Sequence, residues 1–300
     1  MQDYAALFAL AAVVREGSFE RAARALHVTP SAVSQRIRLL EERIGCALVV
    51  RGQPCQATET GRRLCQHVDR VRLLEHELQG EVPAIGQDGD ARVPLPVAVN
   101  ADSLATWFAP AVATFAAAAP VLMEIAVDDQ DFTSEWLRSG RVLAAVTGTA
   151  RAATGCNSRP LGTMRYIAVA SPDFVQRFFA KGVVASSLAQ APSLVFNTKD
   201  ELQSRWVLRL CRRHVELPRH TLPSPQAFVT ASLGGMGWGL HPESLISSHL
   251  NNGSLQELVP DAPLDVPLYW QQARAASSLL DGLTQEVLAA ASATLLQHPL

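Results

Sequence analysis

Residues 15–45 carry a series of helix stop and start signals, which constrain the fold more than any other feature of the sequence. Gly17 can end one helix and Ser18 can cap the next. Thr29 can cap a third helix through its hydroxyl. Pro30 follows it at the first helical position, where the missing N–H of proline costs nothing. Gly45 can end that helix. The spacing predicts three short helices, over about residues 3–15, 19–26 and 30–44.

The third of these helices has two different faces. Its apolar residues recur at helical spacing and should pack on the first two helices; they are Val33, Ile37, Leu40 and Ile44. The opposite face carries hydrogen-bonding side chains at i, i+3, i+4 and i+7, with Arg36 on the flank: Ser31, Ser34, Gln35 and Arg38. Such side chains on a helix suit base edges and phosphates in a major groove. We therefore expect a helix that contacts DNA.

Charge is concentrated around these helices. The chain has 26 basic and 28 acidic residues, yet residues 15–72 alone hold 11 arginines and six acids. Residues 48–51 followed by Gly52-Gln53-Pro54 predict a short strand and turn, a wing that would place Arg51 on the phosphate backbone. The expected partner is double-stranded DNA. The alternative is a three-helix bundle with a solvated arginine-rich surface.

A long helix is predicted from Thr58, as its cap, to about Gln79. An apolar seam runs along it, formed by Leu64, Val68, Val71, Leu74 and Leu78. Such a seam favours pairing with a second copy of the chain, which would present two DNA-binding heads to a palindromic site. The alternative is packing against its own body. Residues 80–94 are rich in glycine and proline and predict a hinge.

The rest of the chain alternates strands and helices. Predicted strands cover residues 95–99, 121–127 and 142–146, with helices over 103–118 and 131–139 between them, which favours a mostly parallel α/β sheet. A second set follows, with strands at 166–170, 194–196, near 221, 238–240 and 268–271, and helices at 202–211, after 224 and at 278–296. The uncharged run 105–123 contains Pro110 and Pro120, so it favours a buried helix and a strand over a membrane span.

Several motifs of this chain resemble those of LysR-type transcriptional regulators. They are Phe19-Glu20-Arg21-Ala22-Ala23, the run from Thr29 to Ile37, Leu40-Glu41 and Thr58-Glu59-Thr60-Gly61. The run from Asn100 to Trp107 resembles the ArgP/LysG branch, regulators of basic amino acid export. The resemblance implies a winged helix-turn-helix at 1–58, a linker and dimerisation helix with hinge at 59–90, and a two-lobed, periplasmic-binding-protein-like effector domain at 91–300. Lobe I would take about 91–162 and 267–300, and lobe II about 163–266.

The resemblance also implies an amino acid bound between the lobes. Polar residues that follow the predicted strands or begin helices are the candidates: Asn100, Asp102, Ser103, Asp129, Thr147, Asn197 and Gln226. Ser103 and Thr147 would hold the carboxylate, and Asp129 or Asp102 the cation. Asn197 and Gln226 stand where that branch carries acids, so a neutral or different effector stays open. Asp200 and Glu201 lie close by and could compensate.

Other chemistries find little support in the sequence. Five cysteines are too few for a disulfide scaffold, and no signal peptide is predicted at the N-terminus, so we expect a cytoplasmic protein. No cofactor, metal or membrane partner is predicted, and no nucleophile–base pair suggests an enzyme. The resemblance implies a homodimer or homotetramer that controls export genes, with RNA polymerase as a candidate partner. The rival interpretations are an architectural DNA-binding protein without ligand sensing and an enzyme that uses the cleft.

Overall fold

The helix boundaries near the N-terminus lie where the capping residues predict them. The computed structural model describes residues 3–81, 93–119, 121–128, 133–138 and 141–297. Its first three helices are α1 (Tyr4–Glu16), α2 (Phe19–Ala25) and α3 (Pro30–Ile44). The side chains of Ser18 and Thr29 accept hydrogen bonds from the backbone N–H groups of Arg21 and Ala32. Gly17 and Gly45 end α1 and α3 in the left-handed conformation, with φ of 68° and 83°. Local sequence therefore fixes these three helices.

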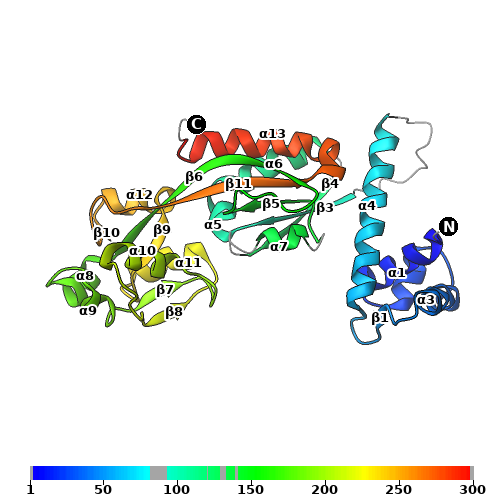
Figure 1. Ribbon diagram of the computed structural model, residues 1–300, viewed down its shortest axis with the longest axis horizontal. Helices are drawn as coiled ribbons and strands as arrows, with labels where there is room; N and C mark the ends of the chain where they lie inside the picture. The colour runs from blue at the N-terminus through cyan, green and yellow to red at the C-terminus, as the bar shows by residue number, and fades with distance from the viewer. Residues whose placement is uncertain (1–2, 82–92, 120, 129–132, 139–140, 298–300) are drawn as a thin grey trace. The chain divides into compact units, whose positions relative to one another are not determined.

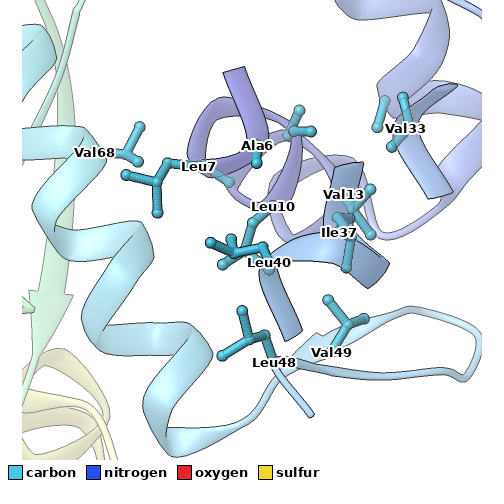
Figure 2. Packing of buried hydrophobic residues seen from close by; sticks show 14 of the residues in the cluster. Ala6, Leu7, Leu10, Val13, Val33, Ile37, Leu40, Leu48, Val49 and Val68 are labelled. Atoms are coloured by element: carbon cyan, nitrogen blue, oxygen red, sulfur yellow. The ribbon is translucent and has the colours of Figure 1, made fainter. Parts of the chain in front are cut away.

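The three helices enclose one apolar core, which we call the head core. Its most buried members include Leu7, Leu10 and Val13 of α1 and Val33 and Ile37 of α3 (Figure 2). The prediction that Ile44 also packs there is wrong: Ile44 lies in the last turn of α3 and is 38% exposed. The apolar face of α3 is therefore buried only as far as Leu40, and its polar face stays on the surface.

The predicted wing is confirmed. Strands β1 (Val49–Val50) and β2 (Gln56–Ala57) pair antiparallel after α3. The Glu41 carboxylate of α3 accepts hydrogen bonds from the backbone N–H groups of Leu48 and Val49, at 2.7 and 3.3 Å. The Leu48 side chain is fully buried in the head core. The wing is thus tied to α3 by a carboxylate and to the core by a leucine.

Helix α4 (Glu59–Glu81) divides its apolar seam between two environments. Val68 is fully buried in the head core, beside Leu7 of α1 (Figure 2). Leu74 and Leu78, about two and three turns further on, are 52% and 45% exposed. The expectation of a seam wholly available for pairing is therefore wrong for its first half, because α1 covers it. The predicted hinge lies mostly outside the described residues.

A second unit, Pro94–Leu300, is built on a mixed seven-stranded sheet. Its order begins β10-β6-β11-β5-β3-β4, with β9 also on β6. The strands are β3 (Val93–Val99), β4 (Val121–Val127), β5 (Ala144–Thr147), β6 (Cys156–Ala170), β9 (Gly239–Pro242), β10 (Gln256–Glu257) and β11 (Leu264–Ala273). Strands β3 and β5 are parallel, but β11 runs antiparallel to both β5 and β6. The expected mostly parallel sheet is thus wrong, because a returning strand enters its middle.

The long strands β6 and β11 connect two lobes (Figure 1). In lobe I, α6 (Ala109–Ala118) and α13 (Ser277–Thr294) lie along one side of the sheet, and α7 (Thr133–Arg138) lies on the other (Figure 1). Lobe II holds the parallel pair β7 (Ser193–Val195) and β8 (Arg219–Thr221). Its helices are α8 (Pro172–Phe179), α9 (Ala185–Leu188), α10 (Leu202–Cys211), α11 (Pro225–Leu233) and α12 (Glu243–Asn251). The predicted two-lobed α/β architecture is confirmed.

The uncharged run 105–123 forms helix and strand, as expected. After α5 (Ala101–Ser103) a π-helical turn (Leu104–Phe108) leads into α6, and β4 follows. Trp107 and Phe108 of the π turn are buried, so this segment fills the core of lobe I. Within the described part of the chain, no helix has the length and apolarity that a membrane span would need.

Candidate functional site

The polar face of α3 forms a candidate DNA-binding surface. Ser31, Gln35 and Arg38 are exposed, and Ser34 and Arg36 are half-buried beside them. The opposite face is held in the head core by Val33, Ile37 and Leu40. Since the buried face fixes the rotation of the helix, the predicted polar residues share one accessible surface. The N-terminal end of α3, where short side chains can reach base edges, projects from the tight turn after α2.

Two arginines of this surface already have partners. Arg38 Nε lies 2.9 Å from the carboxylate of Glu42, one turn along α3. The guanidinium of Arg51, on the wing, lies 5.5 Å from the ring centroid of Phe19. Both contacts are exposed and weak enough to yield to a phosphate. Arg51 is thus held near Phe19 of α2 in the absence of DNA.

A second candidate site is the cleft between the two lobes of the larger unit. From lobe I it is lined by Asn100, Ala101, Asp102 and Asp128, which follow the ends of β3 and β4. From lobe II it is lined by Phe196, Asp200, Leu202, Gln203, Pro225, Phe228 and Leu240. The cavity measures about 20 Å³, room for about one water molecule. A larger ligand can therefore enter only when the lobes separate.

Buried polar atoms without partners lie at the lobe I wall of this cleft. Asn100 is 1% exposed, and neither its side-chain nitrogen nor its oxygen has a hydrogen-bond partner. The same holds for the hydroxyl of Ser103, which is fully buried. Asn100 is the N-cap residue of α5, but its side chain makes no capping hydrogen bond. Because buried polar groups are normally hydrogen-bonded, Asn100 and Ser103 are suited to receive the polar groups of a ligand.

Three carboxylates surround the cleft. Asp102 accepts a hydrogen bond from the hydroxyl of Tyr166 at 2.8 Å, and Asp128 accepts one from the indole N–H of Trp136 at 3.0 Å. Asp200 is 4% exposed and accepts from the backbone N–H groups of Phe196 and Leu202. Burial raises the pKa of Asp200, and these backbone hydrogen bonds oppose that rise. The cleft thus offers negative charge to a cation.

Not all predicted effector residues reach this cleft. Thr147 is buried, but its hydroxyl bonds the Thr149 carbonyl and the Gln271 amide. Asn197 uses its side-chain oxygen to accept from the N–H groups of Lys199 and Asp200. Gln226 is exposed in the first turn of α11. None of these three lines the cleft. Asp129 lies outside the described residues. Of the predicted set, Asn100 and Asp102 line it and Ser103 adjoins Asp102.

None of the lobe II residues that line the cleft belongs to the predicted effector set. Asp200, predicted only as a neighbour that could compensate, lies in the cleft wall, whereas Glu201 is exposed and outside it. Gln203 and Phe228 come from the buried faces of α10 and α11, where a polar or aromatic residue looks like ordinary packing. One usable signal was Gln203, since a buried glutamine in an apolar helix face needs a partner.

A larger cavity, of about 220 Å³, lies where β6 meets α12 and the end of α13. Its lining includes Trp107, Arg165, Glu243 and Leu295, and none of the predicted effector residues. Arg165 there donates two hydrogen bonds, from Nε and Nη2, to the two carboxylate oxygens of Asp265, each at 2.9 Å. The smaller cleft remains the better candidate for a ligand, because its buried polar groups and carboxylates come from both lobes. No cluster of three potential metal ligands occurs among the residues with described positions.

Two family models match this chain, one over the head that carries the candidate DNA-binding surface and one over the unit that carries the cleft. The family model for bacterial regulatory helix-turn-helix proteins of the lysR family matches residues 4–62, and that for the LysR substrate binding domain matches residues 89–292. The HTH-type transcriptional regulator ArgP of Pseudomonas aeruginosa is 48% identical over 291 residues, 96% of each chain. The crystal structure of ArgP from Mycobacterium tuberculosis is 43% identical, with a TM-score of 0.84, and the match covers 99% of this chain and 100% of that one.

A further solved structure carries a ligand in its name. Full-length LysG from Corynebacterium glutamicum with bound effector Arg is 36% identical to this chain, with a TM-score of 0.72. The match covers 99% of this chain and 100% of that chain. The two-unit organisation described above is therefore shared over the whole length with solved regulators.

Proposed function

The chain belongs to the lysR family of bacterial transcriptional regulators, and on that premise we propose that its effector is a basic amino acid, arginine or lysine. The observation that carries this proposal is the cleft, which is lined by three carboxylates and by the buried, unpartnered amide of Asn100. The relative solved with Arg supports the same ligand class. We further propose that the regulated genes serve amino acid export.

The cleft chemistry matches the two ends of such a ligand. The α-carboxylate would take hydrogen bonds from Asn100, Ser103 and the N–H groups at the start of α5. The side-chain cation would be held by a cleft carboxylate, since a charge removed from water needs a charged partner. Asp129 stays a candidate for that role, whereas Thr147, Asn197 and Gln226 do not line the cleft and are given no contact with the effector. A ligand that bridges both lobes favours the closed arrangement and so shifts the equilibrium between them.

The head would read DNA through α3 and hold its backbone through the wing. In this proposal Ser31, Ser34 and Gln35 contact base edges, and Arg36, Arg38 and Arg51 contact guanines or phosphates. Residues 1–58 form the DNA-binding domain, 59–90 the linker and dimerisation segment, and 91–300 the effector-binding domain. The exposed Leu74 and Leu78 of α4 support pairing of two chains. The matched relatives are named regulators, and we infer no catalytic activity.

Replacing Gln35 or Arg51 should weaken DNA binding in two different ways. Gln35→Ala removes a base contact, so we expect a loss of about 1–3 kcal/mol on the operator with little change on random DNA. Arg51→Ala removes a phosphate contact, so binding should weaken alike on both DNAs and the salt slope should fall by about one. Fluorescence anisotropy at several salt concentrations measures both. Equal losses on operator and random DNA for both variants would contradict the assignment.

Thermal unfolding against each of the twenty amino acids tests the effector. A ligand at about 100 times its Kd stabilises the native state by about 2.7 kcal/mol, so arginine or lysine should raise the unfolding midpoint. Asn100→Ala should abolish this shift, because it removes a buried polar group of the cleft. Gln226→Ala is the matched control and should keep the shift, since Gln226 is exposed and outside the cleft.

The other outcomes separate the rival functions. A shift with a different amino acid, but not with arginine or lysine, would keep the regulator and replace the effector. The absence of any shift would favour an architectural DNA-binding protein.

A further inference from the structure

One ion pair joins the two lobes across the effector cleft. The ammonium of Lys199 lies 4.0 Å from Oδ1 of Asp128. Asp128 follows β4 in lobe I and lines the cleft, whereas Lys199 follows β7 in lobe II. The pair therefore holds a primary ammonium from one lobe at a carboxylate of the other. The ammonium is the same chemical group that a lysine effector carries at the end of its side chain.

The Asp128 carboxylate is oriented by its surroundings. Its Oδ2 accepts a hydrogen bond from the indole N–H of Trp136 at 3.0 Å, and its backbone N–H donates to the carbonyl of Val99. The Trp136 ring is itself covered by the guanidinium of Arg141, 5.1 Å from the ring centroid. One oxygen is thus held by a neutral donor, and the other faces the cation. A carboxylate fixed in this way is prepared to receive a cationic group.

The backbone of Lys199 is held by a hydrogen bond, whereas its side chain is half-exposed. Its N–H donates to the side-chain oxygen of Asn197 at 2.7 Å, which also accepts from Asp200. Its side chain is 51% exposed, against 21% for Asp128. Ion pairs this exposed contribute little to stability, because water and salt screen them. The ammonium can therefore be displaced by a competing cation at small cost.

These observations lead to a role for Lys199 in setting the affinity of the site. We propose that Lys199 is an internal competitor that occupies Asp128 in the effector-free protein, and that the cationic side chain of the effector displaces it. The inference rests on the proposed basic amino acid effector. The cleft in this closed form measures only about 20 Å³, so an effector must open it and separate the pair. The fraction of protein with Asp128 unoccupied then scales the apparent Kd.

Isothermal titration of the full-length protein with L-arginine and L-lysine tests the proposal. Lys199→Gln should lower the Kd about twofold to fivefold, the range expected for losing one exposed ion pair. Lys199→Arg keeps the competing charge and should keep the wild-type Kd within about twofold. Lys181→Gln is the matched control, because Lys181 is the only other lysine of the chain and is exposed after α8. Lys181→Gln should leave the Kd for both amino acids unchanged.

A second variant shows that Lys199 acts through Asp128. Asp128→Asn keeps an oxygen for Trp136 but loses the charge, so the Kd for arginine should rise tenfold or more, roughly as for other charge pairs at binding sites. Adding Lys199→Gln to Asp128→Asn should then have no further effect. L-Citrulline, which has the shape of arginine without its charge, should bind wild type far more weakly than arginine does, because it cannot replace Lys199 at Asp128. Far-UV circular dichroism and the thermal midpoint check that each variant is folded.

The other outcomes overturn the proposal. If Lys199→Gln weakens arginine binding, Lys199 contacts the effector instead of competing with it. If Lys199→Gln tightens binding equally in the Asp128→Asn background, it does not act through Asp128. If wild type binds arginine and Lys199→Gln has the same Kd, the competition is absent while the proposed function stands. If wild type binds neither basic amino acid, the proposed effector itself is wrong.

Discussion

Alanine at position 61 is expected to disrupt the DNA-binding head while leaving the effector domain folded. Gly61 lies in the first turn of α4, where a Cβ atom would overlap the backbone oxygen of Leu48. In an exposed helix, a glycine-to-alanine change normally stabilises by about 1 kcal/mol. Here the contact decides the sign, because no heavy atom can approach a carbonyl oxygen so closely.

Leu48 cannot move away at low cost. Its side chain is fully buried in the head core, and its carbonyl accepts a hydrogen bond from the N–H of Thr58 at 3.0 Å. Its own N–H donates to the carboxylate of Glu41 at 2.7 Å. A displacement large enough for the new methyl group breaks these contacts together. We therefore expect Gly61→Ala to cost roughly 3 kcal/mol or more of head stability.

The measurement is thermal unfolding of the full chain, together with operator binding. Gly61→Ala should lose operator binding and lower the unfolding midpoint of the head. It should keep the arginine-induced shift, because Pro94–Leu300 forms a separate unit. Gly52→Ala is the stability control, since its Cβ meets only the carbonyl of Pro54, at 3.4 Å. A Gly61→Ala protein with wild-type midpoint and operator affinity would contradict the steric argument.

Most of the head could be predicted because its determinants are local. The caps Ser18 and Thr29 and the left-handed Gly17 and Gly45 act within a few residues of themselves. The exception is Val68: the apolar seam of α4 shows that the helix packs on something, but periodicity does not tell what covers it. The tertiary structure assigns Val68 to the head core and leaves Leu74 exposed.

The effector domain departs from its prediction where long-range pairing decides. Only residues 166–170 were predicted as a strand, yet β6 begins at Cys156. Its first half contains exposed Arg159 and Pro160 and the kinked Gly162, which locally resemble a turn. That half is held by β11, about a hundred residues later in the chain. The residues near β6 in the sequence do not reveal this distant partner, so only the apolar second half of β6 could be predicted as a strand.

The cleft shows the same division between local and distant causes. Asn100 and Asp102 were predicted because they follow a strand end directly. Thr147 is the last residue of β5, but the side-chain amide of Gln271 on β11 donates hydrogen bonds to its hydroxyl and to the carbonyls of Thr149 and Arg151. A polar residue at a strand end is therefore available to a ligand only when no distant side chain satisfies it first.

Acid should destabilise lobe II through one buried histidine. His241 of β9 is 1% exposed, and its Nε2 lies 3.0 Å from the hydroxyl of Ser232 on α11. Its ring packs edge-on against Phe228, 5.9 Å between centroids. Burial lowers the pKa of His241 from 6.5 to about 4, because the charged ring cannot be solvated there. The folded state thus keeps this imidazole neutral over a range where the unfolded chain protonates it.

The sign of the pH dependence follows from this difference. The folded pKa of His241 lies below the unfolded one, so its contribution is fully present above about pH 6.5 and is lost as pH falls toward 4. A difference of this size is worth about 3 kcal/mol in the free energy of unfolding. His241→Gln should remove this part of the slope in denaturant titrations between pH 7 and pH 4. His214→Gln, at an exposed position, should leave it unchanged.

The same protonation should reach the effector cleft. Phe228 both packs on His241 and lines the cleft, so a charged imidazole loosens one wall of the binding site. The folded state protonates His241 only near pH 4, so we expect the arginine affinity of the folded protein to fall there, and to fall less in His241→Gln. If His241→Gln and wild type show the same acid slope in the free energy of unfolding, the buried neutral histidine does not control the acid stability of this lobe.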